Sequence, residues 1–260
     1  MKKPFSRIGG KSLIVKELEN LLPNNYEDLT YVEPFAGGAS LYFYKNSSRN
    51  IEILNDLDDD IYTLLNGFKT YKIDKINNSM NKIPRTKDFF NKLKDSKPAD
   101  KYSKFIRLLF LKKNSFFGLM RAFMARDNSN FSNFPDYFNR MKNTKVYHES
   151  YDKIIKKYDS KNTIFYLDPP YEKSEGIYEN PYIDYIELAN ILRNIKGAVL
   201  LSINYNKDFI KLFSFLKYKI IKTKYADPLK GGRTREMKEL IFTNYWVLLN
   251  FRKDEEINNH

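Results

Sequence analysis

The stretch Phe165–Tyr171 reads FYLDPPY and contains the strongest structural signal in the chain. Its first half belongs to an apolar run, Thr163–Leu167, whose β-branched and aromatic residues predict a buried strand. Two prolines then end the strand, because proline donates no hydrogen bond and fixes φ. Asp168 and Tyr171 are therefore expected at a rigid corner past the carboxyl end of a strand, where open α/β sheets bind ligands. Such a corner suits a planar group that bears an amine.

Further towards the N-terminus, a strand, a glycine turn, a helix and a strand follow one another, which is the pattern of a βαβ unit. The strands are expected at Thr30–Glu33 and Ile51–Leu54, with a helix over Ala39–Lys45 between them. Gly37 and Gly38 would let a ligand approach the backbone at the helix N-terminus. Alone, such a turn is equally a tight connection, and the dinucleotide spacing Gly-x-Gly-x-x-Gly is absent.

Asp56 supports the interpretation that the glycine turn binds a ligand rather than only connecting two elements. It follows the second strand, about twenty residues after the glycine turn, where a carboxylate can accept both hydroxyls of a ribose. The alternative is a helix cap ahead of Leu57 and Asp58. Together the turn and the acid predict a site for a nucleoside-bearing cofactor.

Between residues 58 and 145 strand signals nearly vanish, and a helical period over Lys101–Lys112 is followed by a loop or hairpin at Asn114–Pro135. After this span α/β alternation resumes. The elements expected there are strands at Thr163–Leu167, Ala198–Ile203, Tyr218–Lys224 and Leu240–Tyr245, with helices at Tyr182–Asn194 and Lys207–Leu216. We therefore predict a discontinuous α/β domain, residues 1–57 and 146–260, interrupted by a mostly helical inserted domain, residues 58–145.

Composition narrows the function classes. The 260 residues carry 45 Lys and Arg against 32 Asp and Glu, a net charge of +13 that favours a polyanionic partner, although a Lys-rich background would give the same balance. The chain has no cysteine, which excludes a thiol nucleophile. It has only two histidines, which disfavours a zinc site built from histidine. No secretory signal and no membrane-spanning apolar run are present. We expect an intracellular protein with no metal and no membrane.

Two basic segments are candidates for anion binding. Lys11 follows a glycine pair at a helix start, where a cation opposes the helix dipole and so suggests a bound carboxylate or phosphate. A solvated lysine is the alternative. The loop Lys230–Arg235 is basic and rich in glycine, which suits contact with phosphates or, equally, a surface turn.

Taken together, these motifs resemble those of the Dam-type (D12 class) DNA adenine methyltransferases. The resemblance spans nearly the whole chain in the family's order: Ile8–Lys11, Glu33–Ser40, Leu54–Asp56, Asp168–Tyr171, and Gly232–Arg235 through Leu240. It implies a Rossmann-like fold that uses S-adenosylmethionine as methyl donor, a target-recognition role for the insert, and double-stranded DNA as partner.

The resemblance also implies roles for individual residues. The catalytic corner would be Asp168, Pro169, Pro170 and Tyr171; the cofactor site would comprise Arg7, Lys11, Phe35, Gly37, Gly38, Asp56 and Asp168; and DNA would be contacted by Phe116, Phe117, Arg121, Lys230, Arg233 and Arg235. Phe117 stands where Dam-type enzymes usually carry Asn, which leaves the recognised DNA sequence open. Oligomeric state is open too, as is whether the protein stands alone, partners a restriction endonuclease that acts on the same site, or is viral.

On this hypothesis Asp168 and the Pro169 carbonyl accept the two N–H bonds of the adenine amino group, Tyr171 stacks on the base, and the base is flipped from the duplex. The absence of cysteine agrees, because methylation of cytosine C5 needs a thiolate. The alternatives are cytosine N4, an RNA base or a glutamine side chain as acceptor, or a DNA-binding homologue that has lost catalysis. A nicotinamide-dependent oxidoreductase is disfavoured by the missing third glycine.

Overall fold

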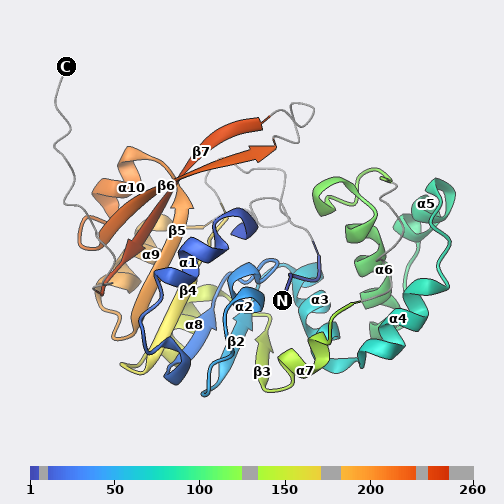
Figure 1. Cartoon of the computed structure of the whole chain (residues 1–260), viewed down its shortest axis with the longest axis horizontal. Helices are drawn as coiled ribbons and strands as arrows, with labels where there is room; N and C mark the ends of the chain where they lie inside the picture. The colour runs from blue at the N-terminus through green and yellow to red at the C-terminus, as the bar shows by residue number, and fades with distance from the viewer. Residues whose placement is uncertain (6–10, 125–133, 171–182, 227–233, 246–260) are drawn as a thin grey trace.

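The protein, described as a computed structural model over residues 1–5, 11–124, 134–170, 183–226 and 234–245, contains a seven-stranded mixed sheet (Figure 1). The strands are β1 (Thr30–Glu33), β2 (Glu52–Asn55), β3 (Thr144–Tyr147), β4 (Thr163–Leu167), β5 (Ala198–Asn204), β6 (Lys217–Ala226) and β7 (Thr234–Thr243). Their order is β3-β2-β1-β4-β5-β7-β6, and only the pairings that involve β7 are antiparallel. The strand order reverses between β1 and β4, so the carboxyl ends of these two strands flank the crevice where such sheets bind ligands.

Helices cover both faces of this sheet. They are α1 (Val15–Asn20), α2 (Ser40–Tyr44), α3 (Asp59–Thr70), α4 (Ile73–Asn81), α5 (Lys87–Asp95), α6 (Lys101–Lys113), α7 (Tyr137–Met141), α8 (Tyr151–Tyr158), α9 (Tyr185–Arg193) and α10 (Lys207–Leu212), with short 3-10 turns at Lys11–Leu13, Tyr26–Asp28 and Phe116–Gly118. Successive strand residues point to opposite faces, so Tyr31 joins an apolar core with α1 and α2, whereas Val32 joins a second core with α8, α9 and α10. The sheet is therefore buried on both sides, as a parallel sheet requires.

The inserted region lies beyond the β3 edge of the sheet, where α4, α5 and α6 gather (Figure 1). Three of its helices begin at residues whose side chains accept hydrogen bonds from free backbone N–H groups of the first turn: Asp58 for α3, Thr86 for α5 and Asp100 for α6. The insert also shares the apolar core of the α1 and α2 face, with Phe68 and Phe105 in edge contact and fully buried. It is thus packed against the sheet rather than tethered to it.

Several boundaries differ from the sequence prediction. β1 and β4 have the predicted bounds, but the helix start predicted at Lys11 is a 3-10 turn, Lys11–Leu13, and α1 begins after it with Ile14 as its N-cap. β3 was not predicted. It is an edge strand with one buried and three partly or fully exposed positions, so it lacks the apolar run that identifies an internal strand. Thr144 and Lys145, assigned to the insert, therefore belong to the sheet.

None of the helices in the described part of the chain has the length and hydropathy that a membrane span requires.

Candidate active site

The turn after β1 is folded against the end of β2. The Ala36 N–H donates to the Asn55 carbonyl (2.8 Å), and Gly37, at a φ of 51°, donates its N–H to Asp56 Oδ2 (2.8 Å). That positive φ is why glycine is needed there. The structure therefore brings the predicted glycine turn and the predicted ribose-binding acid together, and the turn itself orients the carboxylate. Asp56 is only 9% exposed, so a ligand at this position would lose most of its contact with water.

Asn55 was not predicted as a site residue, yet its side chain joins the loops that surround the crevice. Its Nδ2 donates to the carbonyls of Pro34 and Glu149 (both 2.9 Å), and its Oδ1 accepts the Glu149 N–H (3.0 Å). The side chain is fully buried. Asn55 thus ties the turn after β1 to the segment after β3, a contact between distant segments that no local pattern in the sequence reveals.

At the end of β4, Asp168 is held by a buried lysine. Lys11 Nζ lies 2.6 Å from Asp168 Oδ1 and 3.9 Å from Glu239 Oε2, and the side chains of Lys11 and Glu239 are 1% and 0% exposed. The Asp168 side chain keeps 23% exposure, so part of it remains accessible to a ligand at the carboxyl end of β4. The following corner is fixed as well, because the Tyr185 hydroxyl donates to the Pro170 carbonyl (2.7 Å). The sequence analysis predicted Lys11 in the cofactor site; the structure pairs it with Asp168, the predicted catalytic acid.

A third group of residues lines the side of the glycine turn. Phe35 contacts Tyr151, with ring centroids 5.1 Å apart, and the Tyr151 hydroxyl donates to Glu187 Oε2 (2.9 Å). Phe35 was predicted to line the cofactor site, whereas Tyr151 was missed because it begins α8, a helix the sequence analysis did not identify. Phe35 belongs to the turn after β1, so its contact with Tyr151 joins this turn to the start of α8.

The predicted DNA-contacting hairpin has a defined base. Ser115 and Phe123 form an antiparallel bridge, and the Met124 N–H donates to the Asn114 carbonyl (2.8 Å). Arg121 is exposed near the tip of this hairpin. Phe116 is 36% exposed, an unusual position for a large apolar ring. The hairpin therefore carries an exposed cation and an exposed aromatic ring, more than 45 residues before Asp168 in the chain.

Other predicted site residues fall partly or wholly outside this description. Arg7, Tyr171, Lys230 and Arg233 lie outside the described residues. For Phe117 and Arg235 only the backbone is described: Phe117 is in the 3-10 turn Phe116–Gly118, and Arg235 pairs with Tyr225 between β7 and β6. Within the described ranges, no three His, Cys, Asp or Glu side chains are grouped so that they could hold a metal ion.

Glu33, the last residue of β1, is buried and gives a first prediction. Burial raises the pKa of its carboxyl group to about 8. Two hydrogen bonds to Oε1, from the Tyr31 hydroxyl and the Tyr42 N–H, and the charge of Lys45 lower this pKa, but burial outweighs them. The folded chain thus binds a proton that the unfolded chain releases, so stability falls as pH rises from the unfolded value to about 8, by roughly 1.4 kcal/mol per pH unit. Glu33→Gln keeps the accepting oxygen and removes this slope.

Urea unfolding of wild type and Glu33→Gln between pH 5 and pH 9 measures the difference directly. We expect the variant to gain stability relative to wild type as pH rises, and the gain to level off above about pH 8. Two parallel curves would show that Glu33 is ionised in the folded protein at neutral pH.

The strand order, the glycine turn with its acid, and the Asp-Pro-Pro corner define the class: a Rossmann-like methyltransferase that uses S-adenosylmethionine. Residues 8–226 match the family described as D12 class N6 adenine-specific DNA methyltransferase. The chain belongs to this family, so it transfers a methyl group from S-adenosylmethionine to the N6 amino group of adenine in double-stranded DNA.

Curated relatives align over almost their whole length. The chain is 26% identical to the type II methyltransferase M.CviBI of Paramecium bursaria Chlorella virus NC1A, covering 94% of this chain and 97% of that one. It is 25% identical to the type II methyltransferase M.MjaIII of Methanocaldococcus jannaschii. That alignment covers 94% of this chain and 99% of the other. Of the acceptors that the sequence left open, the family match selects adenine in DNA over cytosine N4, an RNA base or glutamine.

Among solved structures, the chain is similar to a putative RNA methyltransferase from Pyrococcus horikoshii, with 12% identity, a TM-score of 0.39, and coverage of 88% of this chain and 81% of that one. It is also similar to a SAM-dependent methyltransferase from Agrobacterium tumefaciens, with 11% identity and a TM-score of 0.40. That alignment covers 89% of this chain and 61% of the other.

Proposed function

We propose that Asp168 and the backbone carbonyl of Pro169 accept the two N–H bonds of the target adenine's amino group, and that Tyr171 stacks on the base. The observation that carries this proposal is the Lys11–Asp168 ion pair: a buried ammonium fixes one oxygen of a carboxylate that is still 23% exposed. Accepting these N–H bonds draws the nitrogen lone pair out of conjugation with the ring, which makes the nitrogen a nucleophile. Asp168 acts as a hydrogen-bond acceptor and need not remove a proton before the methyl group is transferred.

The cofactor is bound, in this proposal, along the glycine turn. Asp56 accepts hydrogen bonds from the ribose hydroxyls, and Phe35 and the turn Gly37–Gly38 lie against the nucleoside. Lys11 contributes by holding Asp168 in position. The residues fit this group, because the Asp56 carboxylate is already oriented by the Gly37 N–H and the same turn carries an aromatic ring, Phe35, that is packed on Tyr151. When bound, S-adenosylmethionine supplies a methyl group on a positively charged sulfur. The contribution of the chain is to place acceptor and donor side by side, which accounts for much of the acceleration.

The target base must leave the duplex to reach this site. Asp168 is only 23% exposed and lies at the end of an internal strand, so a stacked base cannot approach it. Flipping costs a few kcal/mol. The hairpin of the inserted domain supplies the compensating contacts in this proposal, with Phe116 against the bases and Arg121 on a guanine edge. Arg7 completes the cofactor site, and Lys230, Arg233 and Arg235, with Phe117, complete the DNA contacts.

Arg121→Ala should weaken binding to the cognate DNA sequence by roughly 1–3 kcal/mol, because a bidentate contact to a guanine edge is lost. Binding to unrelated duplex should change much less. The measurement is a fluorescence-anisotropy titration with cognate and scrambled duplexes, and Lys97→Ala is the matched control, since Lys97 is an exposed cation elsewhere on the insert. An equal loss on both duplexes would reduce Arg121 to a phosphate contact.

The biological setting we infer is a restriction–modification system inside the cell, with a restriction endonuclease that cuts the same DNA sequence as partner. Both relatives carry type II methyltransferase names, which supports this inference. Sequencing DNA from cells that express the protein, with detection of modified bases, tests the acceptor and the sequence context in one experiment. DNA without N6-methyladenine, from cells that contain the folded protein, would refute the activity and leave a DNA-binding homologue.

A further inference from the structure

Lys3 lies directly against the glycine turn. A Cβ atom built on Gly38 would be 3.3 Å from Lys3 Cδ and 3.7 Å from Lys3 Nζ, with the Phe5 carbonyl oxygen at 3.6 Å. The side chain and its ammonium group therefore run over the backbone of the turn that we assign to the cofactor. A side chain at position 38 would press on the Lys3 side chain, so Gly38 and Lys3 form one contact surface.

The segment that carries Lys3 is held by contacts on both sides of it. Phe5 is 2% exposed and belongs to the main apolar core, and the Lys2 carbonyl accepts a hydrogen bond from the Tyr137 hydroxyl of α7 (2.8 Å). The backbone position of Lys3 is thus set by buried neighbours. Its side chain is half-buried, unlike the exposed side chain of Lys2.

The electrostatic surroundings of Lys3 favour an additional anion. Burial lowers the pKa of its ammonium group to about 8; the charge of Asp168 opposes this change and the charge of Lys11 adds to it. The nearby carboxylate, Asp168, is already within 2.6 Å of Lys11. Two lysines therefore share one catalytic carboxylate. A half-buried cation that is destabilised by desolvation gains from any carboxylate that binds beside it.

We propose that Lys3 binds the carboxylate of the methionine half of S-adenosylmethionine; this assignment rests on the cofactor site proposed above. The glycine turn has two ends. Gly37 contacts Asp56, where the ribose is assigned, and Gly38 contacts Lys3, on the side of Asp168, where the reacting carbon is assigned. A ligand whose ribose is at Asp56 and whose sulfur faces Asp168 has its amino-acid end left for the Lys3 side of the turn. Lys3 is thus a specificity residue for the amino-acid half of the cofactor.

The test compares two ligands that differ in that half alone. S-adenosylhomocysteine carries the carboxylate, whereas 5′-methylthioadenosine keeps the nucleoside and the sulfur and lacks the amino acid. Isothermal titration of both ligands into wild type, Lys3→Met and Lys3→Arg isolates the contact. Lys2→Met is the matched control, because Lys2 is the adjacent lysine and its side chain is exposed.

We expect Lys3→Met to bind S-adenosylhomocysteine about tenfold to a hundredfold more weakly, because one hydrogen bond between charged groups is lost, and to bind 5′-methylthioadenosine as wild type does. Lys3→Arg should restore much of the difference, and Lys2→Met should show none. Equal weakening of both ligands would make Lys3 a structural residue, and weakened binding of duplex DNA with unchanged ligand affinity would make it a phosphate contact; either result overturns the assignment. Wild type that binds neither ligand would overturn the cofactor site itself.

Discussion

Asp168→Asn should lower the rate of methyl transfer about a hundredfold to a thousandfold while leaving the affinity for sinefungin, an analogue of the cofactor, nearly unchanged. The substitution keeps the shape of the side chain and an oxygen that can accept from Lys11. It replaces the other carboxylate oxygen by an NH₂ group, which donates and cannot accept the N–H of the adenine amine. Loss of one preorganised polar contact to the reacting group typically has an effect of this size. Asparagine is preferable to alanine, because alanine would leave Lys11 buried with its 2.6 Å partner removed.

Single-turnover transfer of a labelled methyl group to a duplex that contains the cognate sequence measures this rate, and calorimetry measures sinefungin binding. Asp208→Asn is the control, since Asp208 is 82% exposed on α10 and forms only a surface ion pair with Lys211. Turnover by Asp168→Asn close to that of wild type would mean that Asp168 does not accept the amine. Lost turnover together with lost sinefungin binding would instead assign Asp168 to the cofactor.

The parts of the fold predicted correctly were those with a local signal. β1 and β4 were recovered because internal parallel strands appear as continuous apolar runs that end abruptly. α6 was found from its helical period. The glycine turn and Asp56 were predicted to belong to one site, and they lie in contact because the carboxyl ends of adjacent parallel strands meet at one edge of the sheet.

The missed features depend on contacts between distant segments. Lys11 reaches Asp168 across 157 positions of sequence, and Asn55 reaches Glu149 across 94, so neither partner could be identified from spacing. Glu239 enters the site only because β7 inserts antiparallel beside β5 and brings it opposite Asn204. β3 was missed because an edge strand buries too little to show an apolar pattern. The residues that fix the geometry of the site were thus harder to predict than those that carry its chemistry.

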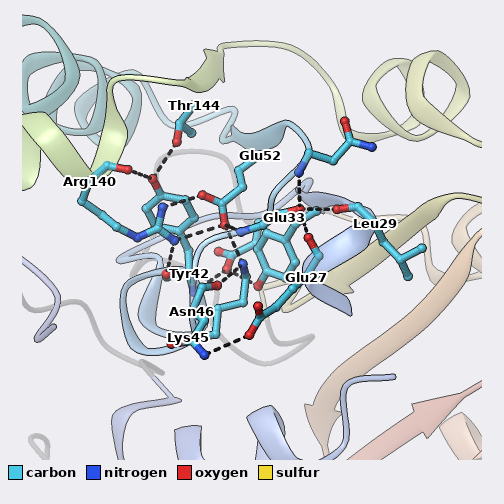
Figure 2. Close-up of polar contacts among 12 residues, drawn as sticks. Glu27, Leu29, Glu33, Tyr42, Lys45, Asn46, Glu52, Arg140 and Thr144 are labelled. Carbon is cyan, nitrogen blue, oxygen red and sulfur yellow. Dashed lines mark hydrogen bonds and ion pairs between the residues drawn. The ribbon is translucent and has the colours of Figure 1, made fainter. Parts of the chain in front are cut away.

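A buried ion cluster holds the inserted domain to the sheet, and its removal should have the largest effect on stability. Glu52, at the start of β2, pairs with Lys45 (2.5 Å) and with both terminal nitrogens of Arg140 on α7 (Figure 2). The side chains of Lys45 and Arg140 are 0% and 10% exposed. Arg140 also lies 3.7 Å from the ring centre of Tyr42 and donates to the Tyr42 carbonyl (2.7 Å). One carboxylate therefore pairs with two buried cations that lie far apart in the sequence.

Glu52→Gln should lower the free energy of unfolding by about 3–5 kcal/mol, because the two cations stay buried without a negative partner. For a chain of this size that corresponds to a fall in melting temperature of about 10 °C. Burial alone would raise the pKa of Glu52, but the hydrogen bonds and charges of Arg140 and Lys45 outweigh it, so the pKa is lowered. The stabilisation is therefore present above the pKa of the unfolded chain and is lost as pH falls through the lowered value.

Thermal and urea unfolding at pH 7 and at pH 4 measure both parts of this prediction. The destabilisation of Glu52→Gln relative to wild type should be large at pH 7 and smaller in acid. Glu33→Gln should instead become more stable relative to wild type as pH rises, because the pKa of Glu33 is shifted in the opposite direction. Asp59→Asn is the matched control: it breaks an exposed pair with Lys104 between α3 and α6, and exposed pairs contribute little. If Glu52→Gln and Asp59→Asn were equally stable at pH 7, the cluster would not hold the insert, and the shared apolar core around Phe68 and Phe105 would have to do so alone.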